Sequence, residues 1–248
     1  MTQLVPGDVA KRAAAQAAAE LVQPGMVLGL GTGSTVAFFL DALGELQRQG
    51  VAVSGVPTSR ATAARAQQLG VSIVDLPATG VDLAVDGADM VDLSLNLIKG
   101  FGGALVRERI VAASATRFVV IVDESKLATA LGGRLPLEIM PFGVERTIHD
   151  IATLLGELPV LRTAGGLPEM SDNGNLLADG ILQTGQDTGA LMALAAALAE
   201  VPGLVGHGLF LSMADDVLVG KGSGRVTSLA HAAEERDPGG PSSRGPGL

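Results

Sequence analysis

The sequence predicts an α/β fold, in which helices flank a mostly parallel sheet and a smaller α+β domain is inserted. Short apolar runs alternate with alanine- and leucine-rich stretches over residues 1–132. Such alternation is typical of parallel strands joined by crossover helices. Hydrophobic residues also make up 47% of the 248 residues, so a large core can be buried. The expected arrangement of this sheet is Rossmann-like.

The first elements follow from composition. Residues 9–22 are rich in alanine, the strongest helix former, and are predicted to be a helix that Pro24 and Gly25 end. The short apolar run over residues 26–30 predicts a buried strand. A glycine-rich turn then leads into a second helix over residues 34–49.

The rest of this part repeats the pattern. Valine-rich runs predict strands, and the stretches between them predict helices, one of which stops at Gly70. The expected strands span residues 51–56, 71–74, 81–85 and 117–122, and the expected helices span 60–69 and 103–114.

Composition changes near Gly132 and Gly133, where we expect the inserted domain to begin. Its expected elements are a strand over 135–140, helices over 144–155 and 188–198, and a turn at Asp172-Asn173-Gly174-Asn175. Apolar runs at 209–211 and 217–219 are expected to return to the first domain. The predicted division is residues 1–132 plus 206–230 for the α/β domain, 133–205 for the insertion, and 231–248 for a disordered tail.

Charge and composition exclude several functions. The net charge is −9 without a basic run, which argues against a nucleic-acid partner. The sequence has no apolar stretch of the roughly 20 residues that cross a bilayer, and no signal-peptide pattern. The absence of cysteine excludes disulfides and thiolate chemistry. We therefore expect a cytoplasmic protein with neither nucleic-acid nor membrane partners.

A glycine-rich turn follows the first strand. Gly29, Gly31 and Gly33 alternate with polar residues that include Thr32, Ser34 and Thr35. Amides at the start of the next helix favour an anion, so the turn predicts a phosphate site. The dinucleotide fingerprint fails because Ser34 stands where a glycine is needed, and no Gly-Lys-Ser/Thr is present. A tight turn without a ligand explains the glycines equally well.

Charged residues cluster downstream. Asp86 and Asp89 follow an apolar strand, and Lys99 precedes a glycine cluster that continues into the helix carrying Glu108. A semi-buried carboxylate is costly unless it has a partner. Turn capping by the aspartates and a solvated helix face for Glu108 are the plain alternatives. A metal site is disfavoured because no histidine lies nearby.

These segments share one edge of the predicted sheet. The glycine turn, Asp86 and the segment from Asp123 to Lys126 each follow a strand. Ligands bind at the carboxyl ends of the strands in such sheets. Carboxylates and a lysine beside bare backbone suit proton transfer next to a carbonyl. Together the segments suggest an enzyme that moves a proton on a phosphorylated sugar.

The ordered set of motifs resembles the ribose-5-phosphate isomerase family, type A, over residues 8–228. The resemblance implies interconversion of ribose 5-phosphate and ribulose 5-phosphate, with no metal and no organic cofactor. It also implies a homodimer or a dimer of dimers. The motifs that carry it are Gly31–Thr35, Val85–Asp89, Lys99–Leu105 with Arg107-Glu108, Asp123–Lys126, Leu135–Glu138 and Asp172–Asn175.

The resemblance also implies roles for residues. Glu108 matches the general base, Asp86 and Lys99 match groups that handle oxygen-bound protons and ring opening, and Asp89 lies beside them. Implied substrate-binding residues are Gly31, Thr32, Gly33, Ser34, Thr35, Gly102, Gly103, Lys126 and Lys11.

Three positions depart from the pattern. Met90 replaces an expected acidic residue, Arg109 replaces lysine, and Phe101 interrupts the glycine run. Three other functions stay open: a phosphosugar-binding regulatory domain, a coenzyme A transferase with a glutamate nucleophile, and an isomerase of another phosphosugar. The roughly 25 residues before the first strand are too few for a DNA-binding helix pair, which disfavours the regulator.

Overall fold

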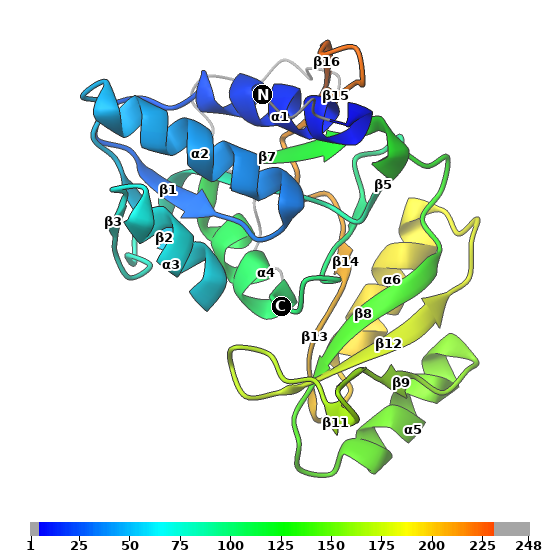
Figure 1. The fold of residues 1–248 in the computed structure, drawn as a ribbon. Coiled ribbons are helices and arrows are strands. Elements are labelled where there is room, and N and C mark those ends of the chain that lie inside the picture. Colours follow the sequence, from blue (N-terminus) through cyan, green and yellow to red (C-terminus); the bar gives the residue numbers. More distant parts are fainter. Residues whose placement is uncertain (1–4, 231–248) are drawn as a thin grey trace.

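The computed structural model describes residues 5–230, which form a larger parallel sheet unit beside a smaller antiparallel one (Figure 1). The larger unit holds a seven-stranded sheet of order β16-β15-β7-β4-β1-β2-β3. All neighbours pair in parallel except β15 and β16. The strands are β1 (Val27–Leu30), β2 (Ser54–Pro57), β3 (Ser72–Ile73), β4 (Val81–Asp86), β7 (Ala115–Asp123), β15 (Asp216–Gly220) and β16 (Val226–Ala230).

Helices cover both faces of this sheet. One face is covered by α1 (Pro6–Ala19), α2 (Ser34–Arg48) and α3 (Arg60–Gln68). The other face is covered by α4 (Leu105–Ser114). Successive side chains of a strand point to opposite faces. Leu83 and Val85 therefore enter the first core, whereas Ala84 enters the second. Asp86 has the same parity as Ala84 and so lies on the side of α4.

Several predicted boundaries were wrong, two of them for clear local reasons. Helix α1 begins at Pro6 because proline fixes φ at a helical value and suits the first turn. Helix α4 begins at Leu105, two residues late, because Gly103 has a φ of +76° that no helix accepts. Strand β2 begins at Ser54, three residues later than predicted.

The smaller unit is a four-stranded antiparallel sheet with two helices packed against it. Its strand order is β13-β8-β12-β9, and a separate hairpin of β10 and β11 follows β9. A third apolar core lies between this sheet and the helices. The elements are β8 (Gly133–Ile139), α5 (Val144–Leu155), β9 (Val160–Leu161), β10 (Thr163–Ala164), β11 (Leu167–Pro168), β12 (Leu176–Leu182), α6 (Thr188–Ala199) and β13 (Leu204–His207).

A three-stranded sheet of order β14-β6-β5 completes the described strands. Its strands are β5 (Met90–Val91), β6 (Leu97–Ile98) and β14 (Leu209–Phe210). Residues 217–219 pair with β7 in the seven-stranded sheet, and residues 209–210 pair with β6, so both segments pair with strands from residues 1–132. The short helix η1 (Glu124–Lys126) follows β7.

The predicted fold class is confirmed, since a mostly parallel sheet with flanking helices is joined to antiparallel sheets. The domain boundaries at 133 and 205 stay predictions. The expected tail over 231–248 lies outside the described residues. Between residues 5 and 230, no helix is long and apolar enough to cross a membrane.

Candidate active site

Asp86 ends strand β4 and packs directly against the glycine turn. Its Oδ1 accepts hydrogen bonds from the amides of Thr32 at 3.0 Å and Gly87 at 2.7 Å. A Cβ added to Gly31 would overlap the Asp86 carboxylate and lie 2.6 Å from its Cα. Glycine at position 31 is therefore what lets Asp86 approach the turn, and the two amides fix its carboxylate.

Lys99 follows strand β6 and binds Asp86 from the other side. Its Nζ lies 2.9 Å from Oδ2 of Asp86, 2.5 Å from the carbonyl oxygen of Gly87 and 3.4 Å from Oε2 of Glu108. Burial alone would lower the pKa of Lys99, but the two carboxylates outweigh burial and raise it. Lys99 is therefore a buried ammonium that two carboxylates keep charged.

Glu108 projects from α4 toward Lys99 and is 3% exposed. Its Oε2 has no hydrogen-bond partner among the described residues. Burial, and then the charge of Asp86, raises the pKa of Glu108 to about 8. The side chain is thus a proton acceptor with a pKa close to neutral pH, which is what a general base requires.

The two arginines beside Glu108 point elsewhere. Arg107 donates from Nε to Oδ1 of Asn173 at 2.7 Å. Arg109 donates to the backbone oxygens of His207 at 2.8 Å and Leu209 at 2.5 Å, and burial lowers its pKa to about 10. The arginine that replaces lysine at position 109 therefore holds β13 and β14 in place.

Asp89 lies beside this group, and its Oδ2 accepts the amide of Phe101 at 2.9 Å. Burial raises the pKa of Asp89, although the Phe101 hydrogen bond and the charges of Lys99 and Lys126 oppose the rise. The structure thus brings Asp86, Asp89, Lys99 and Glu108 together.

The glycine turn faces a set of hydroxyls that sequence reasoning missed. Thr32 Oγ1 lies 2.8 Å from Thr58 Oγ1, 2.9 Å from Ser59 Oγ and 3.2 Å from Thr62 Oγ1. Thr58 and Ser59 follow β2 just as the turn follows β1, and this shared position at the carboxyl edge was the available signal. The hydroxyl network fixes the side chain of Thr32.

The first turn of α2 has the features of an anion site. Gly33 precedes it with a φ of +131° and gives it no side-chain cap, and at its start Ser34 is exposed and Thr35 is half-buried. Uncapped amides at a helix N-terminus favour a phosphate. A Cβ added to Gly102 would lie 3.6 Å from Cγ2 of Thr32, so the second glycine segment faces this turn.

The two remaining lysines are placed differently. Lys126 ends η1, and its charge acts on Asp89. Lys11 lies half-buried on α1 and makes no hydrogen bond or ion pair with another predicted site residue within the described chain. Of the other two departures from the pattern, Met90 packs against the third apolar core, and Phe101 is exposed with its ring under Arg134.

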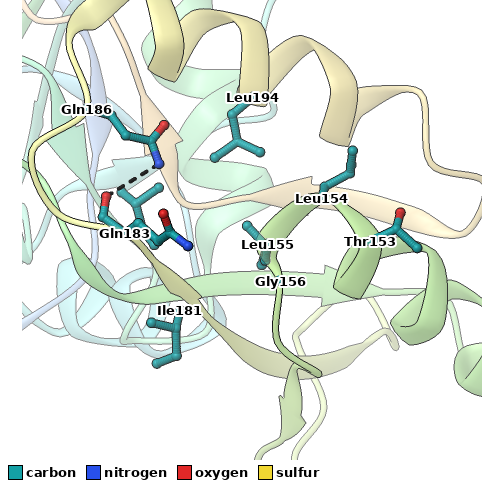
Figure 2. Close-up of a pocket in the computed structure, with 9 residues that line it drawn as sticks. Thr153, Leu154, Leu155, Gly156, Ile181, Gln183, Gln186 and Leu194 are labelled. Carbon is teal, nitrogen blue, oxygen red and sulfur yellow. Dashed lines mark hydrogen bonds between the residues drawn. The ribbon is translucent and has the colours of Figure 1, made fainter.

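A cavity of about 380 Å³ lies elsewhere, in the smaller unit between α5, α6 and β12 (Figure 2). Titratable side chains are absent from its lining, so it cannot supply acid–base chemistry. The lining residues are Thr153, Leu154, Leu155, Gly156, Ile181, Leu182, Gln183, Gln186 and Leu194. Within residues 5–230, no three or more acidic or histidine side chains are grouped to hold a metal ion.

A parallel sheet whose carboxyl edge carries a buried carboxylate, a lysine and bare glycine backbone defines an α/β enzyme of the proton-transfer class. The ribose 5-phosphate isomerase A (phosphoriboisomerase A) family model matches residues 54–224. The chain belongs to the ribose 5-phosphate isomerase A family.

Individual relatives agree. The chain is 43% identical to ribose-5-phosphate isomerase A of Ruegeria sp. over 90% of this chain and 87% of the relative. It is similar to the solved ribose 5-phosphate isomerase from Plasmodium falciparum, with a TM-score of 0.85, 37% identity and coverage of 92% and 100%. A D-ribose-5-phosphate isomerase in complex with phospho-erythronic acid gives a TM-score of 0.84 and 35% identity, with coverage of 92% and 100%.

Replacing Gly31 with alanine should displace Asp86. The added methyl group has no room beside the Asp86 backbone, and such overpacking costs about 1–3 kcal/mol. We expect a lower melting temperature and a loss of isomerase activity of at least tenfold. The matched control is Gly7→Ala, because a Cβ at Gly7 meets nothing within 4 Å. Equal activity in the two variants would contradict this account of Gly31.

Proposed function

We propose that this chain interconverts D-ribose 5-phosphate and D-ribulose 5-phosphate through an enediolate. The observation that carries the proposal is the buried group of Glu108, Lys99 and Asp86, with distances of 2.9 Å and 3.4 Å from the lysine to its two carboxylates. Membership of the ribose 5-phosphate isomerase A family supports the choice of substrate.

Glu108 is the proposed carrier of the carbon-bound proton. It removes the proton from C2 of the open-chain aldose and returns a proton to C1 to give the ketose. Meanwhile the hydroxyl proton leaves O2 and a proton arrives at O1, so that the reaction is a balanced isomerisation. Asp86 is the proposed relay for these oxygen-bound protons and the proposed aid to ring opening, with Asp89 beside it; its contact with Lys99 supports this role. The raised pKa of Glu108 supports its role.

Negative charge develops on oxygen in the enediolate and needs donors. Lys99 is charged and buried next to the base, and the amide of Gly102 lies on the segment that faces Thr32. The amide of Gly103 instead donates to the backbone oxygen of Gly100 at 3.1 Å. A preorganised donor such as Lys99 or the Gly102 amide is typically worth about 3–4 kcal/mol. These donors support a reaction without metal or organic cofactor.

The phosphate is proposed to bind the turn before α2. Thr32, Ser34 and Thr35 with the amide of Gly33 supply donors, and Lys126 and Lys11 supply charge. The amide of Gly31 already donates to the backbone oxygen of Val85 at 3.0 Å, so Gly31 contributes only the close approach of its backbone. Binding energy from the phosphate then offsets the entropy lost when C2 is held near Glu108.

The pH dependence of the reaction should follow Glu108. Because its pKa is raised to about 8, most of the base is protonated at pH 6 and inactive. We expect kcat/KM for ribose 5-phosphate to rise from pH 6 to pH 8.5 and then level off. Initial rates in buffers of constant ionic strength measure this. A flat profile across that range would argue against Glu108 as the base.

The deciding experiment follows the proton at C2. Ribose 5-phosphate deuterated at C2 is incubated with the enzyme and a chelator, and deuterium loss and ketose formation are measured together. Both are expected. An enzyme that acts on a hexose or amino-sugar phosphate but not on ribose 5-phosphate would replace this function with the alternative isomerase. A covalent glutamyl adduct with an acyl-coenzyme A would support a transferase instead.

Finer properties stay predictions that rest on the family resemblance. These are a homodimer or dimer of dimers, a cytoplasmic location, the absence of nucleic-acid and membrane partners, and the division at residues 133–205. Light scattering tests the first of them, with two or four times the 25.0 kDa of one chain expected.

A further inference from the structure

A buried arginine of the smaller unit holds the loop that follows Lys99. Arg162 lies between β9 and β10, and its side chain is 6% exposed. Its Nη1 donates to the backbone oxygen of Gly100 at 3.1 Å and to that of Phe101 at 3.2 Å. A buried guanidinium is costly unless its donors are used. The backbone oxygens of Gly100 and Phe101 accept hydrogen bonds from a guanidinium nitrogen that would otherwise be buried without a partner.

Arg162 is itself fixed on its other side. Its Nε lies 3.0 Å from both oxygens of Asp179, and its Nη2 lies 2.7 Å from Oδ1. Its backbone amide donates to Leu177 at 2.8 Å, and its backbone oxygen accepts from Glu169 at 2.9 Å. A planar guanidinium paired in this bidentate way has little freedom to move. The loop is therefore tied to a rigid point on β12.

Holding the two carbonyl groups also sets the direction of two amides. The described backbone contains no cis peptide, and in a trans peptide the C=O and N–H point in opposite directions. The peptide that joins Gly100 to Phe101 offers its N–H to Asp89. The next peptide turns the N–H of Gly102 away from Arg162. This amide has no acceptor within residues 5–230.

We propose that Arg162 is a positioning residue for the isomerisation. By holding the loop, Arg162 leaves the Gly102 amide free to donate to the enediolate oxygen and keeps the Phe101 amide on Asp89. The inference rests on the proposed function, because the amide has this task only if an enediolate forms. Gly102 lies opposite Thr32, on the side of the turn where the phosphate is proposed to bind. Arg162 acts through the loop and need not touch the substrate.

Arg134 provides a matched control within the same cluster. It pairs with Asp179 at 2.7 Å and lies over the ring of Phe101 at 4.5 Å. Unlike Arg162, it donates to no backbone oxygen of the loop in the described chain. Arg162→Met and Arg134→Met therefore each remove one charge and one partner of Asp179. Only the first also removes the donor to the Phe101 carbonyl group and one of the two donors to the Gly100 carbonyl group, which keeps the amide of Gly103.

The test compares kcat and KM of these variants with ribose 5-phosphate. In Arg162→Met, kcat should fall about 30- to 100-fold, while KM changes less than threefold. This loss is at or just below the roughly 100-fold minimum for removal of one oxyanion donor, because the Gly102 amide is misdirected and not removed. Arg134→Met should stay within threefold in both constants. Arg162→Lys keeps the charge but cannot span Asp179 and two carbonyl groups, so its kcat should remain low.

Hydrogen exchange of residues 99–104 gives a second measurement that does not depend on turnover. Exchange should be faster in Arg162→Met than in wild type and unchanged in Arg134→Met. If Arg162→Met does not fold, Arg162→Lys and Asp179→Asn carry the comparison, with an intermediate kcat loss expected for the latter.

Three results would overturn the inference: a kcat within threefold of wild type, an equal loss in Arg134→Met, or a loss confined to KM. A wild-type enzyme inactive on ribose 5-phosphate would remove the proposed function instead. In that case the exchange rates still decide whether Arg162 holds the loop.

Discussion

Glu108→Gln should lower kcat for ribose 5-phosphate by about 10⁴-fold, the upper range for removal of a general base. Glutamine has the same shape as glutamate but cannot accept the carbon-bound proton. The substitution should also fit the site, because in the described residues Oε2 of Glu108 makes an ion pair with Lys99 but no hydrogen bond of ordinary geometry. The amide oxygen can face Lys99, which lies 3.4 Å away.

Substrate binding must be measured as well as turnover, because a loss of binding would also lower the rate. Calorimetric titration with ribose 5-phosphate should give a Kd within about threefold of the wild-type KM, because the glycine turn and its hydroxyls are untouched. Glu145→Gln, on the exposed first turn of α5, is the matched control and should be fully active. Residual activity above about 1% of wild type in Glu108→Gln would remove this residue from its proposed role.

Lys99→Met should damage both stability and catalysis. The ammonium is the positive charge that contacts Asp86 and Glu108 in the described site, so its removal leaves two buried carboxylates without a counter-charge. Breaking a buried ion pair in this way typically costs about 3–5 kcal/mol. Loss of the same group as an oxyanion donor should lower kcat by about 10²- to 10³-fold.

The stability loss of Lys99→Met should depend on pH. At pH 5 Glu108 is protonated, because its pKa is raised to about 8, and one fewer carboxylate needs the lysine. Urea unfolding should therefore show a smaller loss at pH 5 than at pH 8.5. Lys221→Met removes an exposed charge from the turn between β15 and β16 and serves as the control. A loss that is equal at both pH values would contradict the assigned pairing.

The positions of Asp86 and Glu108 could be predicted because one ends a recognisable strand and the other lies on a recognisable helix, whereas Lys99 follows the two-residue strand β6 and was tied to them by the resemblance. Asp86 ends an apolar strand, and residues adjacent in a helix face different directions, which separates Glu108 from its arginine neighbours. The order of the elements and the fold class followed from the same alternation. A side chain is easiest to predict when one local element determines its direction.

Other parts of the site depend on contacts between distant segments. Arg162 is 62 residues from Gly100 in the chain, and no periodicity relates them. The three strands β5, β6 and β14 each span two residues, too few to show alternation. Pairing in the folded chain alone defines such strands and contacts, so the sequence could not reveal them.

The burial of Glu108 makes the stability of the fold depend on the protonation state of the proposed base. Its pKa in the folded chain, about 8, exceeds the ordinary value of 4.5, so between these values unfolding releases a proton. Its contribution to stability is complete below pH 4.5 and is lost as the pH rises through 8. The folded chain is therefore most stable while Glu108 is protonated. It loses part of that stability when Glu108 is ionised, which is the form that can accept a proton from the substrate.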